Sequence, residues 1–271
     1  RMDPNEVNVS QDDEGHLHIV VDGLLWRTVF WEMPILSTVS ELYHIMNHDD
    51  IDYDHNAEYR NTYHKAEMMI RNGVKFSDFG TRRRFSFNHQ DLMIEALVDA
   101  QTDNQTYDGK FVGTSNVFFA KKYDLIPIGT MSHQFIETCS LFGYNEANYI
   151  AMDYWQDCFR GDLGTFLYDT YTRKAFFDNF TELHAKLFDG LRAIKVHDKV
   201  DGRMKDSYGI GTNLMCDVTN VKPMNIVVKL TSAKITEKRE WKNVVKLSDD
   251  HGKYTGDPTE IEIAKHTLGL E

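Results

Sequence analysis

The chain has 271 residues and a formal net charge of −12, because 42 Asp and Glu residues outnumber 30 Lys and Arg residues. This acidic balance argues against a general nucleic-acid-binding protein, which is usually basic. The sequence has no run of eighteen apolar residues and no signal peptide, so we expect a soluble, cytoplasmic protein that does not bind a membrane.

The N-terminal part of the sequence predicts a β-hairpin followed by two helices. Residues 16–21 alternate between polar and apolar side chains, Asp22-Gly23 predicts a turn, and residues 25–30 predict the second strand. Helices are predicted over residues 34–46, behind a proline, and over residues 57–71, before an Asn-Gly pair. Neither helix carries an obvious catalytic group.

A basic turn follows the next predicted strand, residues 74–79. The strand runs into Gly-Thr and then into Arg82, Arg83 and Arg84. Guanidinium groups match the oxygens of phosphate and carboxylate, so we interpret this turn as an anion site rather than a solvated basic loop. Asn88 is predicted to cap the helix that comes after it.

Residues 109–133 predict a strand–helix–strand unit. The strands 110–112 and 126–128 both run into Gly-Thr, and a short helix over residues 115–123 connects them. Parallel strands joined in this way end at one edge of a sheet, which is where α/β barrels bind ligands. His133 follows the second turn at the start of a helix, where the dipole disfavours a charged imidazole and favours a phosphate. We therefore expect His133 to be a neutral nucleophile or the neighbour of a phosphate.

The remaining sequence repeats the order of strand, small polar turn and helix, which predicts an α/β protein. Residues 208–210 predict a strand that runs into Gly211-Thr212, and a late glycine-rich turn is a common phosphate site in barrels. The other predicted elements are helices over 145–159, 174–180 and 259–268, strands over 165–168 and 187–191 that end at Asp169 and Arg192, and β structure over 225–230 and 244–247.

The cysteines and histidines do not predict a metal site. Cys139, Cys158 and Cys216 lack metal-like spacing and are odd in number, so we expect free thiols in a reducing compartment. The histidines show no clustering that suggests zinc.

Five motifs, in the order FGTRRRFS, FVGTSNV, PIGTMSHQF, YDT and GIGTN, resemble those of the nicotinate phosphoribosyltransferase family of bacterial and yeast type. The likeness covers almost the whole chain. It implies an irregular TIM-like α/β barrel core over residues 74–222, with an additional mostly β domain built from both chain ends. The ends are a hairpin with helices in residues 1–73 and strands with a helix in residues 223–271.

The resemblance also implies an activity. The family forms nicotinate mononucleotide and pyrophosphate from nicotinate and phosphoribosyl pyrophosphate, in NAD salvage. ATP hydrolysis drives the step through a phosphohistidine, which makes the enzyme a C–N bond-forming ligase. The resemblance further implies Mg²⁺ and ATP as cofactors and a homodimer with its site at the subunit boundary.

Roles for single residues follow from the same motifs. By resemblance, His133 is the phosphorylated histidine, Thr130 lies by nicotinate and Arg192 holds the nicotinate carboxylate. Arg82 and Arg83 correspond to the arginines around the carboxylate and pyrophosphate, and Gly211 and Thr212 to the turn that binds the 5′-phosphate. Asp169 is a looser candidate for a ribose or metal-side contact.

The chain departs from the family pattern in two places. The family continues LFDGLR with an Asp-Ser-Gly-Asp motif, whereas Arg192 is followed here by Ala-Ile-Lys. The family also has an earlier portion that supplies a ring-stacking tyrosine. We therefore expect a gap near residues 192–193 and an incomplete N-terminal region, and we interpret both stretches as missing from this chain rather than from its gene.

Three alternatives stay open at this point. A sister phosphoribosyltransferase acting on nicotinamide or quinolinate would share the barrel and its phosphate sites. A non-catalytic barrel remnant that binds a nucleotide would fit the missing Asp-Ser-Gly-Asp motif. A phosphate-binding aldolase-type barrel is a distant third, because no lysine is predicted at a suitable strand end.

Overall fold

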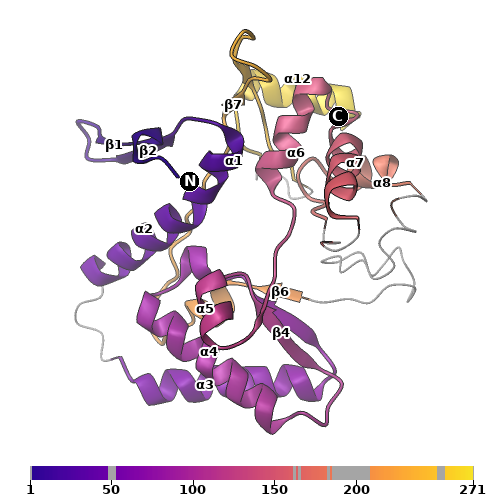
Figure 1. Ribbon diagram of the computed structural model, residues 1–271. Helices are drawn as coiled ribbons and strands as arrows, with labels where there is room; N and C mark the ends of the chain where they lie inside the picture. Colours follow the sequence, from indigo (N-terminus) through magenta and orange to yellow (C-terminus); the bar gives the residue numbers. More distant parts are fainter. Residues whose placement is uncertain are drawn as a thin grey trace. The chain divides into compact units, whose positions relative to one another are not determined.

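The structure of the chain is a computed structural model that describes residues 2–47, 53–160, 163, 166–181, 184, 208–248 and 254–270. The chain forms two compact units, each made of two separate stretches (Figure 1). The first unit comprises Arg1–Ile128 and Tyr208–Val228, and the second comprises Gly129–Ser207 and Lys229–Glu271. In the part of the chain that is described, no helix combines the length and apolar character needed to cross a membrane.

The first unit opens with a short 3-10 helix, η1 (Pro4–Glu6), and a β-hairpin. Strand β1 (Val7–Gln11) pairs antiparallel with β2 (Leu17–Val21), so that Val7 lies opposite Val21. The hairpin loop is held by Asp12, whose carboxylate accepts hydrogen bonds from the amides of Glu14 at 3.0 Å and His16 at 2.8 Å. The predicted strand over residues 16–21 is therefore confirmed.

The prediction that residues 25–30 form the second strand of the hairpin is wrong. These residues form α1 (Leu25–Thr28) and most of the 3-10 helix η2 (Val29–Trp31). Strand β2 takes its partner from the residues before it, and the amide of Asp22 closes the ladder on the carbonyl of Glu6. The chain then leaves the sheet, and the amides of Arg27 and Thr28 donate instead to the carbonyl of Leu24 in a helical turn.

Two longer helices follow and confirm the predicted ones. Helix α2 spans Glu32–Asn47 and α3 spans His55–Arg71. Asp54 caps α3 by accepting hydrogen bonds from the amides of Asn56 and Ala57, as expected for an acidic N-cap residue. The chain leaves α3 through Asn72 and Gly73, whose φ of 77° favours glycine.

The centre of the first unit is a parallel sheet with the strand order β5-β4-β3-β6. Its strands are β3 (Lys75–Asp78), β4 (Lys110–Thr114), β5 (Ile126–Pro127) and β6 (Tyr208–Ile210), and all three pairings are parallel. In this register Asp78 lies beside Thr114 on one side and Ile210 on the other. The strand ends that the sequence predicted to share one edge therefore do so.

Helices pack on this sheet and form the core of the unit. Helix α4 spans Phe87–Asp103, α5 spans Val117–Lys122, and the short α11 spans Thr212–Met215. Ile70 of α3 and Ile94 of α4 are buried with Phe76 and Phe111 of the sheet. Burying an apolar side chain of this size stabilises the fold by about 1.5–3 kcal/mol.

The predicted N-cap of α4 is wrong by two residues. The hydroxyl of Ser86, and not the side chain of Asn88, accepts the capping hydrogen bond, from the amide of His89 at 3.0 Å. The helix therefore begins at Phe87, directly after the basic turn.

The second unit is mainly helical. Its elements are α6 (His133–Cys139), η4 (Ser140–Phe142), α7 (Ala147–Phe159), α8 (Arg173–Asn179), β7 (Ser232–Ala233), β8 (Lys242–Asn243) and α12 (Pro258–Leu268). The core of the unit includes Ile136, Met152, Tyr171 and Leu247, from segments far apart in the sequence. The predicted helices 145–159, 174–180 and 259–268 are confirmed within two residues at either end.

Some predicted strands of this part are wrong or lie elsewhere. Residues 166–168 and 225–230 have no regular strand, and the short pair β7–β8 lies further along the chain. An apolar run forms a strand only where another strand can pair with it, and the sequence of the run does not reveal whether such a partner exists. The predicted strand 187–191 lies outside the described residues.

The mixed α/β class with a parallel sheet is thus confirmed. The closed barrel and the added β domain stay predictions. The predicted segments 1–73, 74–222 and 223–271 are each one continuous stretch of the chain. Each compact unit of the structure is instead made of two stretches that are distant in the sequence.

Candidate functional site

The carboxyl edge of the parallel sheet in the first unit is organised by Asp78, which is fully buried at the end of β3. Its carboxylate accepts hydrogen bonds from the hydroxyl of Thr114 at 2.6 Å, the amide of Gly80 at 2.7 Å and the side-chain amide of Gln90 at 3.2 Å. Burial raises the pKa of the Asp78 carboxyl above its ordinary value, and these hydrogen bonds oppose the rise by favouring the charged form. The ends of β3 and β4 are thereby joined to α4.

The same network holds the start of the basic turn, the 3-10 helix η3 (Thr81–Arg83). The hydroxyl of Thr81 accepts hydrogen bonds from Gln90 at 2.7 Å and from the side-chain amide of Asn116 at 3.1 Å. Gln90 therefore contacts Asp78 and Thr81 with one nitrogen, which fixes the turn relative to the strand end. The sequence predicted the turn but not the residues that hold it.

The three arginines of the turn have different surroundings. Arg82 is 44% exposed and lies 3.9 Å from Glu32. Burial and the neighbouring charge of Arg82 lower the pKa of the Arg83 guanidinium, and within the described residues the buried Nε of Arg83 has no hydrogen-bond partner. Both side chains fit the predicted role of binding an anion.

Arg84 is instead part of the internal structure. Its side chain is only 12% exposed and pairs with Glu41 at 3.1 Å. Its guanidinium carbon also lies 5.1 Å from the ring centre of Phe87. We therefore assign the anion site to Arg82 and Arg83 alone.

The late glycine turn lies directly beside the basic turn. The amide of Phe79 donates to the carbonyl of Ile210 at 2.8 Å, and Gly211 follows. A Cβ on Gly80 would lie 2.8 Å from the carbonyl oxygen of Gly211 and 2.3 Å from Cγ of Met215, so only glycine allows this approach. Thr212 begins α11, and the first amides of a helix lack partners within the helix. The sheet edge thus brings Arg82, Arg83, Gly211 and Thr212 into one region.

The predicted imidazole lies in the second unit at the first residue of α6. Ser132 caps this helix by accepting from the amide of Phe135 at 3.2 Å. The ring of His133 is held by its Nδ1, which lies 2.9 Å from the hydroxyl of the buried Thr170. The predicted YDT motif therefore contacts the histidine, a relationship that the sequence did not indicate.

A lysine and a carboxylate lie at the other ring nitrogen. Nζ of Lys246 is 3.2 Å from Nε2 of His133 and 3.4 Å from Oδ2 of Asp169. Oδ1 of Asp169 is itself 3.7 Å from Nε2. His133, Asp169, Thr170 and Lys246, which we call the imidazole cluster, bring together two predicted residues and two that sequence reasoning missed.

Two further residues, Thr130 and Arg192, were predicted to contact nicotinate. Thr130 lies three residues before His133, and its hydroxyl donates to the carbonyl of Met131 at 2.9 Å. Arg192 lies outside the described residues. The predicted meeting of the imidazole with the arginine turn in one pocket stays a prediction.

The sequence held only weak signals for the residues that were missed. Asp78 follows a predicted strand and precedes the FGTRRR motif, and Lys246 interrupts the apolar run of residues 244–247. A polar residue at a strand end or inside an apolar run is a candidate for a buried contact. Its partner is set by tertiary packing.

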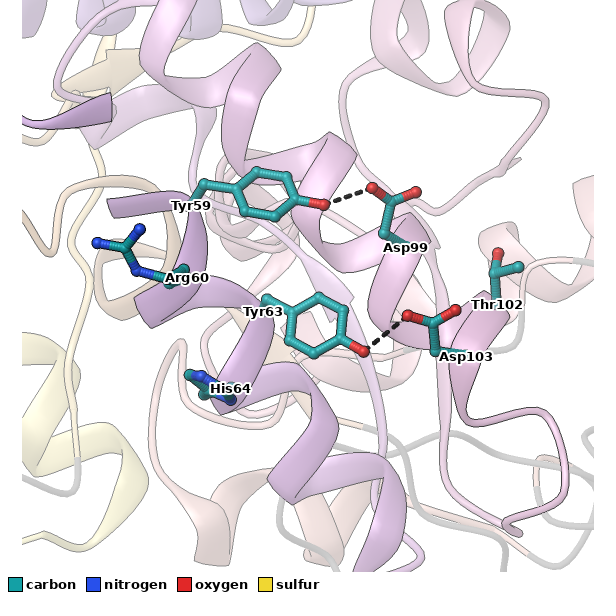
Figure 2. Close-up of a pocket in the computed structure, with 7 residues that line it drawn as sticks. All are labelled: Tyr59, Arg60, Tyr63, His64, Asp99, Thr102 and Asp103. Carbon is teal, nitrogen blue, oxygen red and sulfur yellow. Dashed lines mark hydrogen bonds between the residues drawn. The ribbon is translucent and has the colours of Figure 1, made fainter. Parts of the chain in front are cut away.

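A groove of about 570 Å³ on the first unit contains none of the predicted residues. Figure 2 shows Tyr59 and Tyr63 extending from α3 towards Asp99 and Asp103 of α4, and each tyrosine hydroxyl is hydrogen bonded to its aspartate. The groove is lined by Tyr59, Arg60, Tyr63, His64, Asp99, Thr102 and Asp103. Its aspartates and tyrosines are engaged with each other, so we do not assign a site to it.

Comparison with known families gives one match across most of the chain. The model of the nicotinate phosphoribosyltransferase (NAPRTase) family matches residues 74–193 and 192–271. The two matched parts meet at residues 192–193, where the sequence predicted a gap.

Individual relatives agree with this match. The chain is similar to the nicotinate phosphoribosyltransferase of Chromohalobacter salexigens, with 36% identity over 100% of this chain and 77% of the relative. It is 35% identical to the enzyme of that name from Desulforapulum autotrophicum, over 96% of this chain and 75% of the relative. The crystal structure of nicotinate phosphoribosyltransferase from Porphyromonas gingivalis superposes with a TM-score of 0.86 and 39% identity, over 99% of this chain and 78% of that one.

Proposed function

The chain is a member of the nicotinate phosphoribosyltransferase family, and we propose that it couples synthesis of nicotinate mononucleotide to ATP hydrolysis through phosphorylation of His133. Its substrates are nicotinate and phosphoribosyl pyrophosphate, and its product is used for NAD. The observation that carries the coupling is the imidazole cluster, which fixes both ring nitrogens of His133.

In the transfer step, the pyridine nitrogen of nicotinate forms a bond to C1 of the ribose. The bond from C1 to pyrophosphate breaks, and the leaving group keeps the electron pair. Catalysis therefore depends on orientation and on charge that matches the anions. We assign pyrophosphate and the nicotinate carboxylate to Arg82 and Arg83, and the 5′-phosphate to Gly211 and Thr212. The exposed guanidinium of Arg82, and the position of Arg83 next to it in the same turn, support this assignment.

Further contacts are proposed from the motifs. Thr130 lies by the nicotinate ring and Arg192 adds a contact to the carboxylate. Both assignments rest on resemblance to the family motifs.

In the ATP-dependent step, the lone pair on Nε2 of His133 attacks the γ-phosphorus. The N–P bond forms, the bond to the bridging oxygen breaks, and ADP leaves with that electron pair. The proton on Nδ1 stays in its hydrogen bond to Thr170. Water later cleaves the N–P bond and releases phosphate, so that one ATP is consumed for each turnover that is driven forward.

Mg²⁺ is proposed to bind with the nucleotide. Among the described residues, no group of three or more His, Cys, Asp or Glu side chains is arranged to hold a metal ion. Mg²⁺ keeps several waters and needs only one or two carboxylates besides the phosphates, and Asp169, 42% exposed, fits one such contact. When bound, the ion would offset the negative charge of the phosphates.

The larger assembly is also part of the proposal. We propose an irregular TIM-like barrel, an added β domain and a cytoplasmic homodimer. Exposed apolar residues near the N-terminus support a partner surface: Val9, Leu17, Val20, Trp26 and Phe30 are each more than half exposed.

The proposal is tested with the purified protein and His133→Ala. The wild type should form nicotinate mononucleotide, release ADP in step with product, and take up ³²P from γ-labelled ATP as an acid-labile, alkali-stable protein phosphate. His133→Ala should keep some phosphoribosyl transfer, take up no label, and release no ADP in step with product, because the nucleophile is gone.

His266→Gln is the matched control, because His266 is an exposed histidine of the same unit. It should behave as the wild type does. A His133→Ala protein that still consumed ATP in step with product would overturn the phosphohistidine assignment. A wild-type protein that made no nicotinate mononucleotide from nicotinate and phosphoribosyl pyrophosphate would overturn the activity.

A further inference from the structure

Lys246 is a residue of the imidazole cluster for which neither the motifs nor the family match supplies a role, yet its position is closely held. Its backbone pairs on both sides with Thr255, with the two hydrogen bonds at 3.0 and 2.9 Å. The neighbouring Val245 and Leu247 are fully buried. The backbone is therefore fixed, and its side chain, only 13% exposed, ends at His133.

One pair of segments holds both nitrogens of the imidazole. The amide of Leu247 donates to the carbonyl of Thr170 at 2.8 Å, and the hydroxyl of that threonine contacts Nδ1 of His133. Asp169 contacts the ammonium group of Lys246. A displacement of either segment would therefore move both ring contacts together.

The chemistry of these partners defines the state of the ring. A lysine ammonium group only donates hydrogen bonds, so Nε2 of His133 must accept and the proton of the neutral ring resides on Nδ1. Asp169 alone, 3.7 Å from Nε2, would favour a proton on that nitrogen and remove its lone pair. The ammonium group of Lys246 offsets this carboxylate charge and fixes the tautomer in which Nε2 carries the lone pair.

We propose that Lys246 is a catalytic residue of the phosphoryl-transfer step, which holds Nε2 of His133 ready for attack and then binds the phosphoryl oxygens. This inference rests on the proposed phosphorylation of His133. When Nε2 forms the N–P bond and ADP leaves with the electrons of the broken P–O bond, the nitrogen no longer has a lone pair to share with Lys246. The ammonium group then donates to the oxygens on the new phosphorus, which lie next to its former partner.

A purely structural ion pair between Lys246 and Asp169 is the competing explanation. It would predict lost stability in a Lys246 variant without a specific effect on the histidine. The test therefore needs readouts that a structural pair would not change, namely the tautomer of His133 and the rate of its phosphorylation at saturating ATP.

The experiment uses Lys246→Met, which keeps the length of the side chain and removes the charge and the donors. Single-turnover labelling with γ-³²P-ATP should be about 10²-fold slower than in the wild type, as when one donor to a developing charge is removed. The affinity for ADP, which lacks the transferred phosphate, should be unchanged. Imidazole ¹⁵N NMR without nucleotide should show the Nδ1–H tautomer of His133 in the wild type and its loss in the variant.

Lys174→Met is the matched control, because Lys174 is an exposed lysine of the same unit that pairs with Asp178. It should leave the tautomer and the labelling rate unchanged. Lys246→Gln separates the two roles, because its amide can still donate to Nε2 but has no charge. It should keep the tautomer and still lose most of the labelling rate, and it serves as the test if the methionine variant does not fold.

The outcomes separate this inference from the proposed function. A wild type that takes up no label overturns the phosphohistidine and, with it, the phosphoryl contact of Lys246. A labelled wild type with an equally fast Lys246→Met or Lys246→Gln protein overturns the role of Lys246 alone. If His133 keeps the same tautomer in Lys246→Met, the proposed contact of Lys246 with Nε2 is overturned, whatever the rate of labelling by ATP.

Discussion

The hydroxyl of Thr114 donates to the carboxylate of Asp78 over 2.6 Å and joins the carboxyl ends of two adjacent parallel strands. Both residues are fully buried, so water cannot replace this hydrogen bond. The turn that follows β3 carries Gly80, Thr81 and the arginines, and Asn116, in the turn that follows β4, donates to the hydroxyl of Thr81. Asp78 therefore positions the anion site without contacting a substrate itself.

Asp78→Asn should reduce the free energy of unfolding by about 1–3 kcal/mol, because an amide replaces one of the two acceptor oxygens with a donor. The KM for phosphoribosyl pyrophosphate should rise as the arginine turn loses its anchor. Urea denaturation and steady-state kinetics measure the two effects. Asp108→Asn, at an exposed position, should change stability by less than about 0.5 kcal/mol. A variant as stable as the wild type would contradict the anchoring role.

The stability that depends on Asp78 should fall as the pH rises. Burial raises the folded-state pKa of this carboxyl above its ordinary value of 3.8, so the folded state holds the proton more tightly than the unfolded state does. Its contribution is fully present below the ordinary value and is lost as the pH passes through the raised one. The difference in unfolding free energy between the wild type and Asp78→Asn, measured from about pH 4 to about pH 8, should therefore decrease. A difference that grew with pH would show the opposite shift.

Gly80→Ala should destabilise the first unit by about 1–3 kcal/mol, because the new methyl group would overlap Met215 and the carbonyl of Gly211. Gly129→Ala is a suitable comparison for thermal unfolding, because Gly129 also precedes a threonine and has nothing within 4 Å of the position of a Cβ. The alanine at residue 80 should lower the melting temperature far more than the alanine at residue 129. Equal melting temperatures would mean that the two turns do not lie as close as described.

The arginines of the basic turn should separate into two classes. Arg82→Met and Arg83→Met should raise the KM for anionic substrates at least about tenfold, as expected for the loss of a charge-assisted hydrogen bond, with little effect on unfolding. Arg84→Met should mainly reduce stability, because it breaks the pair with Glu41 and the contact with Phe87. Kinetics and urea denaturation of the three variants decide this. A pure KM effect in Arg84→Met would place that side chain at the substrate.

Thr170→Val should slow the labelling of His133 by ATP, because it removes the oxygen that fixes Nδ1 while keeping the volume of the side chain. Thr170→Ser should retain most of the rate, since its hydroxyl can take the same position. The measurement is single-turnover labelling with γ-³²P-ATP. If valine and serine gave the same rate, the hydrogen bond would have no part in the reaction.

The sequence predicted well those features that depend on neighbouring residues. The strand ends at residues 78 and 210 lie close to predicted Gly-Thr pairs, whereas Gly113 and Thr114 are the last two residues of β4 itself. Helices such as α3 and α12 were predicted because their caps and apolar faces are local. The misplaced strand over residues 25–30 shows the limit of this reasoning, because a strand is defined by its partner.

The sequence by itself therefore determined the α/β class, the family and the positions of the basic turn and the Gly-Thr turns, because each of these depends on short motifs of neighbouring residues. Tertiary structure alone decided that Gln90 would contact Asp78 and that Lys246, 113 residues from His133, would reach its Nε2. Arg84 was likewise separated from its neighbours only by the position of Glu41. The physical reason is that burial and the charge of a spatial neighbour set the state of a polar group, and both arise only when distant segments pack together.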